Sequence, residues 1–266
     1  MKKKLKKFFY IILRFYIPDC IKGHSFFLKK IKDHDLIVDL GSNKGEFEKI
    51  FLSQKKNVYF SSIEFDENHN KEKINKNNFA VNKILSDHDG VESINLIQSK
   101  KDPKYFGKIW SIVEDKDWHI LKKKNYDSIS LKSFLKLSKK KFDVKKIGLI
   151  KLDVEGAEIK ALKSLDDEDL KDIDQITLEF HDFMFHTQKK ESDDLIEHFK
   201  NQGFYFFDFS LKEKRRDVLL IKENNLNFLE KYFCNFFTSA KIKNYLNNHN
   251  NLLRSYLLLF YRNYIQ

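Results

Sequence analysis

The segment Asp39-Leu-Gly-Ser-Asn-Lys-Gly-Glu-Phe47 decides the fold of this chain. It follows the apolar run Leu36-Ile37-Val38 and opens a stretch with helical spacing. The glycines at 41 and 45 let the backbone turn where a side chain would clash. The helix that begins after the turn leaves backbone N–H groups free to bind a polar or anionic ligand. The segment therefore predicts a strand, a ligand-binding turn and a helix.

A carboxylate closes the next apolar run, Val58-Tyr-Phe-Ser-Ser-Ile-Glu64. Glu64 lies 19 residues after Gly45, close to the ~20-residue offset at which an acid reaches a ribose hydroxyl in dinucleotide folds. The turn has the spacing Asp-x-Gly-x-Asn-x-Gly and not Gly-x-Gly-x-x-Gly. This spacing favours S-adenosylmethionine over a dinucleotide pyrophosphate as the ligand.

Strand patterns and helical patterns alternate from residue 36 onward. Strands are expected at 36–41, 58–65, 79–85, 147–153 and 174–180. Helices are expected between them, at 45–56, 66–77, 156–165 and 189–201. This alternation predicts an α/β fold in which a mostly parallel sheet carries helices on both faces.

Two apolar runs after Gly203 are joined by charged residues, which predicts an antiparallel β-hairpin at 204–222. A mostly parallel sheet that ends in such a hairpin is typical of the Rossmann-like methyltransferase fold. The pattern is weaker in the middle of the chain, where we expect short strands at 92–98 and 126–130 and a position for a substrate lid. A helix is expected at 131–140.

The charge of the 266 residues divides the chain into three parts. Residues 1–32 carry a net charge of +9 and indicate a basic amphipathic helical extension. Residues 33–225 carry −2 and form the Rossmann-like domain, and residues 226–266 carry +4 and indicate a C-terminal helical extension. The basic, aromatic-rich ends suit either packing on the domain or peripheral contact with an anionic membrane.

The cysteines, Cys20 and Cys234, lie far apart and in no metal-ligand spacing, which favours free thiols in a reducing compartment. No stretch approaches the ~20 apolar residues of a membrane-spanning helix. We therefore expect a cytoplasmic protein, or one that is peripheral on the inner face of the cytoplasmic membrane. The near-neutral middle part argues against a nucleic-acid partner.

A second segment with chemical potential is Leu149-Ile-Lys-Leu-Asp-Val-Glu-Gly-Ala-Glu158. Its carboxylates follow an apolar strand, and ligands of open α/β sheets bind at the carboxyl ends of the strands. Capping and ion pairing account for Glu158 and for Lys151. They account less well for Asp153, because a carboxylate at the end of a central strand is costly to bury without a partner.

Glu179 and His181 end the next predicted strand and are expected to face the same crevice. A histidine there can take a proton from a hydroxyl, because its usual pKa lies near working pH. The alternative is that His181 only partners the turn after Asp153. We take Asp153 and His181 as candidate bases, with Glu155 and Glu179 as orienting or metal-binding groups. These residues could hold a divalent cation, but their spacing does not require one.

Together, these motifs resemble the FkbM family of S-adenosylmethionine-dependent methyltransferases. The family's first motif, Asp-Val/Ile-Gly-Ala-Asn-x-Gly, corresponds to residues 39–45, and its later signature, Lys-x-Asp-x-Glu-Gly-Ala-Glu, stands intact at 151–158. The Glu-x-His that follows the next strand matches residues 179–181. The resemblance covers about residues 36–222. It departs from the family at Leu131-Lys-Ser133, where many members carry an acidic stretch.

The resemblance implies a role for each matching cofactor residue. The turn would cradle the methionine part of S-adenosylmethionine, Glu64 would hold the ribose, and Ser86 and Asp87 would lie near the adenine. The residues of the turn that are implicated in this way are Asp39, Gly41, Ser42, Asn43 and Gly45.

The resemblance also implies the activity, which is O-methylation of a hydroxyl on a small-molecule or glycan acceptor, such as a sugar of a surface glycan or another secondary metabolite. One alternative is a non-catalytic Rossmann-like scaffold in a membrane-associated glycan biosynthesis complex. A nucleic-acid methyltransferase is less well supported, because the chain has no Asn-Pro-Pro-aromatic segment and no Pro-Cys nucleophile; its only prolines are Pro18 and Pro103.

Overall fold

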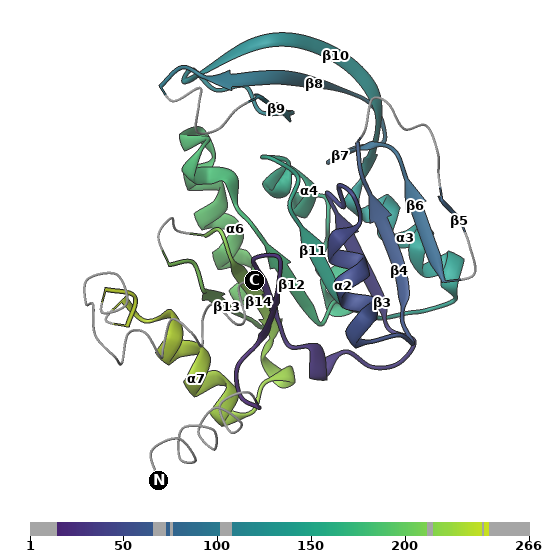
Figure 1. Ribbon diagram of the computed structural model, residues 1–266, viewed down its shortest axis with the longest axis vertical. Helices are drawn as coiled ribbons and strands as arrows, with labels where there is room; N and C mark the ends of the chain where they lie inside the picture. Colours follow the sequence, from purple (N-terminus) through teal and green to yellow (C-terminus); the bar gives the residue numbers. More distant parts are fainter. Residues whose placement is uncertain are drawn as a thin grey trace.

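The computed structural model describes residues 15–65, 73–74, 77–101, 108–211, 215–240 and 242–244. The strands of its main sheet are Leu36–Leu40 (β3), Tyr59–Ile63 (β4), Lys73–Ile74 (β5), Asn78–Val81 (β6), Ile147–Leu152 (β11), Gln175–Leu178 (β12), Phe204–Asp208 (β13) and Val218–Lys222 (β14). They pair in the order β13-β14-β12-β11-β3-β4-β6-β5 (Figure 1). The five strands from β12 to β6 are parallel, whereas β14 and β5 are antiparallel to their neighbours.

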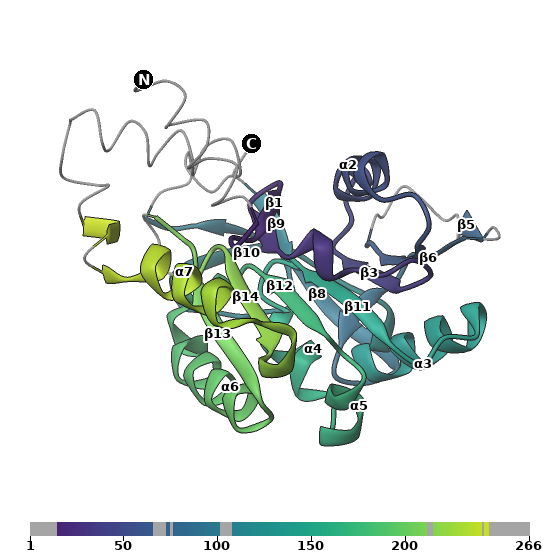
Figure 2. The same ribbon diagram turned by 90° about the horizontal axis from the view of Figure 1, so that it is seen from below.

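Helices cover both faces of this sheet (Figure 2). One face carries Leu131–Phe142 (α3), Glu158–Lys163 (α4), Asp167–Lys171 (α5) and Lys189–Asn201 (α6), and the other carries Glu46–Gln54 (α2) and Phe228–Thr238 (α7). Each face has its own apolar core, because the central strands are buried on both sides. Short 3₁₀ helices lie at Leu28–Lys30, His181–Phe183, His186–Gln188 and Glu223–Asn225. The expected Rossmann-like fold with its terminal hairpin is confirmed.

A second sheet arches over the carboxyl ends of the parallel strands (Figure 1). Its strands are Ile84–Ser86 (β7), Gly90–Ser99 (β8), Lys108–Ser111 (β9) and Trp118–Ser130 (β10), in the order β7-β10-β8-β9. The short strands expected at 92–98 and 126–130 are parts of the much longer β8 and β10. The insertion therefore forms an ordered arch, in which β10, β8 and β9 pair antiparallel and β7 pairs parallel with β10.

Two local expectations were wrong. The single strand expected at 79–85 is divided, since β6 ends at Val81 in the main sheet and β7 begins at Ile84 in the arch. Within the range 66–77, where a helix was expected, residues 73–74 form the strand β5, which pairs with β6. Residues 66–72 and 75–76 lie outside the described part. The helix at 189–201 and the hairpin after Gly203 are confirmed.

Where the structure describes the N-terminal extension, it has no α-helix and only the short 3₁₀ helix at Leu28–Lys30. Asp19–Ile21 (β1) and His24–Phe26 (β2) form an antiparallel hairpin. Its two-residue turn, Lys22-Gly23, has φ of +54° and +83°, the backbone of a turn that matches the twist of a hairpin. This glycine is the sequence signal that a helical interpretation overlooks.

Hydrogen bonds fix this hairpin to the main sheet. The N–H and the hydroxyl of Ser25 donate to the Asp217 carboxylate at 2.8 and 2.7 Å, and the Phe27 N–H donates to Gln175 Oε1 at 2.8 Å. Burial raises the pKa of Asp217 to about 6. Residues 17–31 thus contribute to the core of the domain, so the boundary expected between residues 32 and 33 does not hold. Residues 1–14 lie outside the described part.

At the other end, α7 begins with a reciprocal cap in which Asn227 and Glu230 exchange side-chain and backbone hydrogen bonds. The part of the expected C-terminal helical extension that follows residue 244 lies outside the described residues. None of the described helices is long and apolar enough to cross a membrane.

Lys132, where the family is often acidic, pairs with Asp166 and Asp169 and so ties α3 to α5.

Candidate active site

A cavity of about 290 Å³ lies at the carboxyl ends of β3, β4 and β11, beneath the arch. Its volume is close to the lower end of the ~300–1,000 Å³ that is typical of small-molecule sites. The sheet supplies a polar wall, which comprises Gly41, Asn43, Glu64, Asp153 and Glu155. The arch supplies a mostly apolar wall, which comprises Ile94, Ile109, Trp110, Ser111 and Ile112.

The turn between β3 and α2 contacts both strands that flank β3, which are β4 and β11. The N–H groups of Gly41 and Ser42 donate to the carbonyl of Ile63 at 2.9 and 3.2 Å. Gly41 has φ of +77°, and a Cβ at this position would lie 1.7 Å from the carbonyl oxygen of Asp153. Glycine is therefore required here for the packing of β3 against β11, as well as for the approach of a ligand.

Asp39 lies buried beneath this turn. Its Oδ1 is 3.3 Å from Lys151 Nζ, and the same ammonium donates to the carbonyl of Gly41 at 2.8 Å. Burial raises the pKa of Asp39, and the charge of Lys151 opposes that rise. Asp39 thus supports the turn through Lys151 and does not line the cavity; Ser42 and Gly45 likewise shape the turn without lining it.

Glu64 lies at the end of β4, where it accepts a hydrogen bond from the N–H of Asn43 and faces the cavity. Beyond Glu64 the cavity becomes apolar apart from one lysine. The residues that line this end are Phe65, Lys83, Ile84, Leu85 and Trp110. Because β6 ends at Val81, earlier than expected, the residues that reach the cavity after this strand are 83–85.

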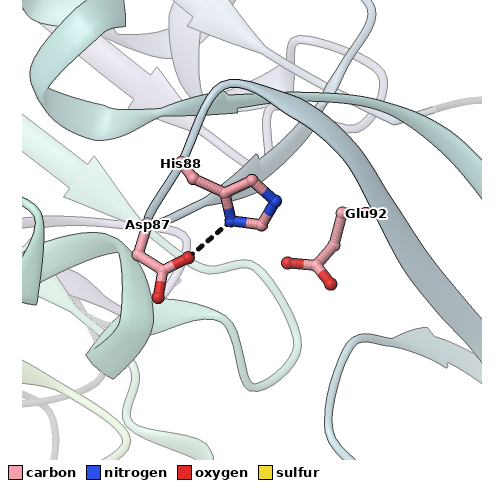
Figure 3. A group of neighbouring side chains, drawn as sticks. All are labelled: Asp87, His88 and Glu92. Atoms are coloured by element: carbon pink, nitrogen blue, oxygen red, sulfur yellow. Dashed lines mark hydrogen bonds and ion pairs between the residues drawn. The ribbon is translucent and has the colours of Figure 1, made fainter.

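Ser86 and Asp87 follow the cavity residues in the chain but belong to a different cluster. Figure 3 shows Asp87 of this cluster with His88 and Glu92. Asp87 Oδ1 is 2.8 Å from His88 Nδ1, and the Ser86 hydroxyl donates to Glu92 at 2.5 Å. Lys160 of α4 pairs with Glu92 and lies 3.6 Å from Asp87. This cluster ties the arch to α4, and the lysine supplies the positive charge that its carboxylates need. Neither Ser86 nor Asp87 lines the cavity.

The loop that follows β11 is organised around Glu158, whose side chain is fully buried. Its carboxylate accepts hydrogen bonds from the N–H groups of Val154, at 3.0 Å, and Gly156, at 3.1 Å. Glu155 between them has φ of +51°, an unusual backbone for a non-glycine residue that persists only where the surroundings impose it. The Ser111 hydroxyl of the arch donates to the Glu155 carbonyl at 2.6 Å, so the arch helps to hold this loop.

His181 connects Glu158 to the candidate catalytic acids. Its Nδ1 is 2.8 Å from Glu158 Oε1, while its Nε2 lies 3.3 Å from Glu155 Oε2 and 3.9 Å from Asp153 Oδ1. Glu179 directly follows β12 and accepts a hydrogen bond from Arg216 at 2.8 Å. The structure therefore brings the four predicted catalytic residues into one group.

The charges within this group give its members different pKa values. Burial lowers the pKa of His181, but the carboxylates of Glu158, Glu155 and Asp153 prevail and raise it to about 10. Burial alone would raise the pKa of Asp153, yet the contact with His24 and the charge of Lys151 hold it well below its usual range. His181 is consequently a cation and Asp153 an anion near neutral pH, and neither is poised to exchange a proton there.

Glu155 is the acid poised to exchange a proton. Burial raises its pKa to about 7; the His181 charge opposes this rise, and the charges of Asp153 and Glu158 add to it. Its side chain is 46% exposed, and the residue lines the cavity. The expectation that His181 or Asp153 acts as the base therefore fits the structure less well than a base role for Glu155.

Ligand atoms of Asp153, Glu179 and His181 lie within 4.8 Å of one another. A divalent cation could bridge such a set of ligands. Two carboxylates of the set already have cationic neighbours, because Lys151 lies 3.9 Å from Asp153 and Arg216 pairs with Glu179. Metal use remains a prediction, and an assay with and without EDTA tests it.

The structure adds a residue that the sequence did not suggest. His24 of the N-terminal hairpin is buried, with Nε2 3.6 Å from Asp153 Oδ2. Its ring lies edge-on to Phe47 of α2 at 6.2 Å between centroids. Asp153 is thus flanked by His24 on one side and by His181 on the other. No sequence motif marks His24; the hairpin turn at Gly23 is the only local signal.

We expect His24→Phe to lower kcat about ten- to hundredfold while the affinity for cofactor changes little. The phenyl ring keeps the packing on Phe47 but removes the group that holds Asp153, and an interaction with a charged group contributes ~1.5–3 kcal/mol. Steady-state kinetics with separate kcat and KM values measure this effect. His198→Gln, at an exposed position on α6, is the control. An unchanged kcat in His24→Phe would remove His24 from the site.

A sheet of this order, closed by an antiparallel hairpin and with its cavity at the carboxyl ends of the parallel strands, is that of a Rossmann-like methyltransferase. The model of the methyltransferase FkbM domain matches residues 39–206. This match covers more than half of the chain and includes both motifs, so the chain belongs to the FkbM methyltransferase family.

No protein among the curated sequences matches the chain. Among solved structures, it is similar to a precorrin-6y C5,15-methyltransferase from Geobacter metallireducens GS-15, with 8% sequence identity and a TM-score of 0.34. The match covers 73% of this chain and 84% of that one. A likeness at this score supports no further argument.

Proposed function

We propose that this protein is an S-adenosylmethionine-dependent O-methyltransferase that acts on a hydroxyl of a sugar in a surface glycan or of another secondary metabolite. The observation that carries the proposal is the position of Glu155, which lines the cavity and has its carboxylate 3.3 Å from His181 Nε2. The family supplies the class of acceptor. The free thiols Cys20 and Cys234 favour a cytoplasmic location.

The cavity fits the proposed cofactor in its distribution of polarity. Gly41 and Asn43 of the first turn would hold the methionine part, and Glu64 would accept hydrogen bonds from the ribose hydroxyls. The apolar end lined by Phe65, Ile84 and Trp110 suits an adenine ring. When bound, S-adenosylmethionine supplies a methyl group attached to a positively charged sulfonium.

The chain's own residues then have to bind the acceptor and remove its proton. An aliphatic hydroxyl is a poor nucleophile, so a base contributes about 10²–10⁴-fold to the rate. Glu155 takes this proton in our proposal. His181 is a cation 3.3 Å away and stabilises the charged Glu155 carboxylate. When Glu155 accepts the proton and becomes neutral, His181 loses this anionic partner. Asp153 stays ionised and orients the groups around it.

Labelled methyl transfer tests this function. The protein is incubated with methyl-tritiated S-adenosylmethionine and, separately, with cell-surface polysaccharide, small polyhydroxylated metabolites and nucleic acid. We expect label in a polysaccharide or metabolite fraction, as an ether that resists alkaline hydrolysis. Label released by alkali would indicate a methyl ester, and label in nucleic acid would indicate a different class of acceptor. Cofactor binding without transfer to any fraction would favour the scaffold alternative.

A further inference from the structure

The outer side of α7 exposes apolar side chains in one stripe. Phe228, Leu229, Tyr232 and Phe236 are 80%, 41%, 55% and 39% exposed. Positions 228, 232 and 236 are four residues apart, so they lie along one face of the helix. The opposite face packs Cys234 and Phe237 into the core. Exposed aromatic side chains in a continuous stripe are typical of an interaction surface.

This stripe has no exposed acidic neighbour on its own helix. The only acid of α7 is Glu230, which is 1% exposed and pairs with Lys29 at 2.5 Å and with Lys30 at 2.9 Å. The remaining charged residue of the helix is Lys231. The face of α7 therefore presents aromatic rings without negative charge.

The positively charged ends of the chain meet the structure at this helix. The ring of Tyr16 stacks on Phe233 of α7 with 5.9 Å between centroids, and the adjacent Phe15 is 61% exposed. In the sequence, residues 1–14 contain six lysines and arginines and no acid, and residues 245–266 contain two arginines and no acid. Both ends are also rich in aromatic and aliphatic residues.

We propose that the α7 face, defined as Phe15, Phe228, Leu229, Tyr232 and Phe236, docks on an anionic lipid surface. Aromatic side chains partition into the interfacial layer of a bilayer, and nearby lysines and arginines are attracted to anionic headgroups by about 1 kcal/mol each. A helix with this polarity would lie in the plane of the interface. In Figure 1, α7 lies away from the arch, so docking leaves the region of the cavity clear.

Charge favours the lipid surface over a second copy of this chain. Each copy of this chain carries a net charge of +11, and like charges oppose association. An anionic membrane instead neutralises them. The proposal does not depend on the methyltransferase reaction, since it rests only on this surface.

Co-sedimentation of the full chain with vesicles tests the proposal. One set of vesicles contains phosphatidylcholine alone, and the other also contains phosphatidylglycerol. The variant Phe228→Ser/Tyr232→Ser removes two exposed rings. The matched control, Ile120→Ser/Leu121→Ser, removes two apolar side chains that are 48% and 47% exposed on β10. All four substituted positions are surface positions, so a retained circular dichroism spectrum verifies the fold of each variant.

We expect binding to the anionic vesicles that weakens as salt is added. The α7 variant should bind at least about tenfold more weakly, because it loses two aromatic side chains that would bury apolar area in the bilayer, while the β10 control binds like the parent. Equal binding of the parent and the α7 variant would overturn the proposal, and so would absence of binding to anionic vesicles. A concentration-dependent dimer that only the α7 variant loses would assign this face to a second copy instead.

Discussion

Glu155→Gln is expected to lower kcat by about 10²–10⁴, the range for loss of a general base, with little change in cofactor affinity. Glutamine keeps the size of the side chain and cannot take a proton. The fixed backbone around Glu155 should persist, because its bonds come from Ser111 and from the Glu158 carboxylate beside it. Steady-state kinetics with an accepted substrate, together with calorimetric titration of S-adenosylhomocysteine, separate the two effects.

The pH profile of the same variant sharpens this prediction. In the parent protein, kcat/KM should rise with pH through about 7, because Glu155 accepts a proton only when it is ionised and its pKa is raised to about 7. A second change is expected near pH 10, where His181 loses its charge. Glu155→Gln should lack the rise near 7. Glu114→Gln, at an exposed acid paired with Lys123, is the control; if Glu155→Gln kept the parent's rate and profile, another residue would be the base.

The second large effect is expected on stability. Glu158→Ala should lower the free energy of unfolding by ~3–5 kcal/mol, the range for removal of one partner of a buried ion pair. The change leaves the N–H groups of Val154 and Gly156 without their acceptor and the His181 imidazolium without its closest anion. Urea denaturation followed by circular dichroism measures the loss.

Two further variants serve as references for that result. Glu191→Ala removes an acid whose ion pair with Lys163 lies on the surface, and such pairs contribute little. Glu158→Gln keeps an acceptor for the backbone and should cost less than alanine. Equal stability of Glu158→Ala and Glu191→Ala would show that the buried carboxylate does not organise the loop.

The parts of the fold that the sequence predicts well are those with a repeating local pattern. The central strands β3 and β11 are mostly apolar because helices bury both of their faces. The helix at 189–201 has a clear amphipathic period and a glycine beyond its end, at Gly203. The two motifs stand at the carboxyl ends of these parallel strands, so both motifs lie at the same edge of the sheet and define the site.

The arch could not be predicted in the same way. In β10, residues 119–123 are exposed one after another, so alternation between buried and exposed positions is absent and the segment resembles a polar loop. Its partner β8 pairs with it along most of its length, and such pairing is set by the whole fold. Trp110 and Ser111 reach the site only through the arch, which explains why the sequence did not identify them.

The electrostatics of the site also depend on contacts that are distant in the sequence. The motifs identified Asp153, Glu155, Glu179 and His181, but residue type alone does not distinguish the protonation of the three carboxylates. The structure separates their pKa values through His24, which lies 129 positions before Asp153 in the chain, and through the buried Glu158. The assignment of the base therefore required the folded arrangement.

The most direct test of the central claim is calorimetric titration of the full chain with S-adenosylhomocysteine, with NAD as the comparison ligand. The account predicts binding of S-adenosylhomocysteine with a dissociation constant of about 1–100 μM, or ~5.5–8 kcal/mol, and no binding of NAD. Absence of binding to S-adenosylhomocysteine, with or without added divalent cation and acceptor, or equal binding of NAD would contradict it.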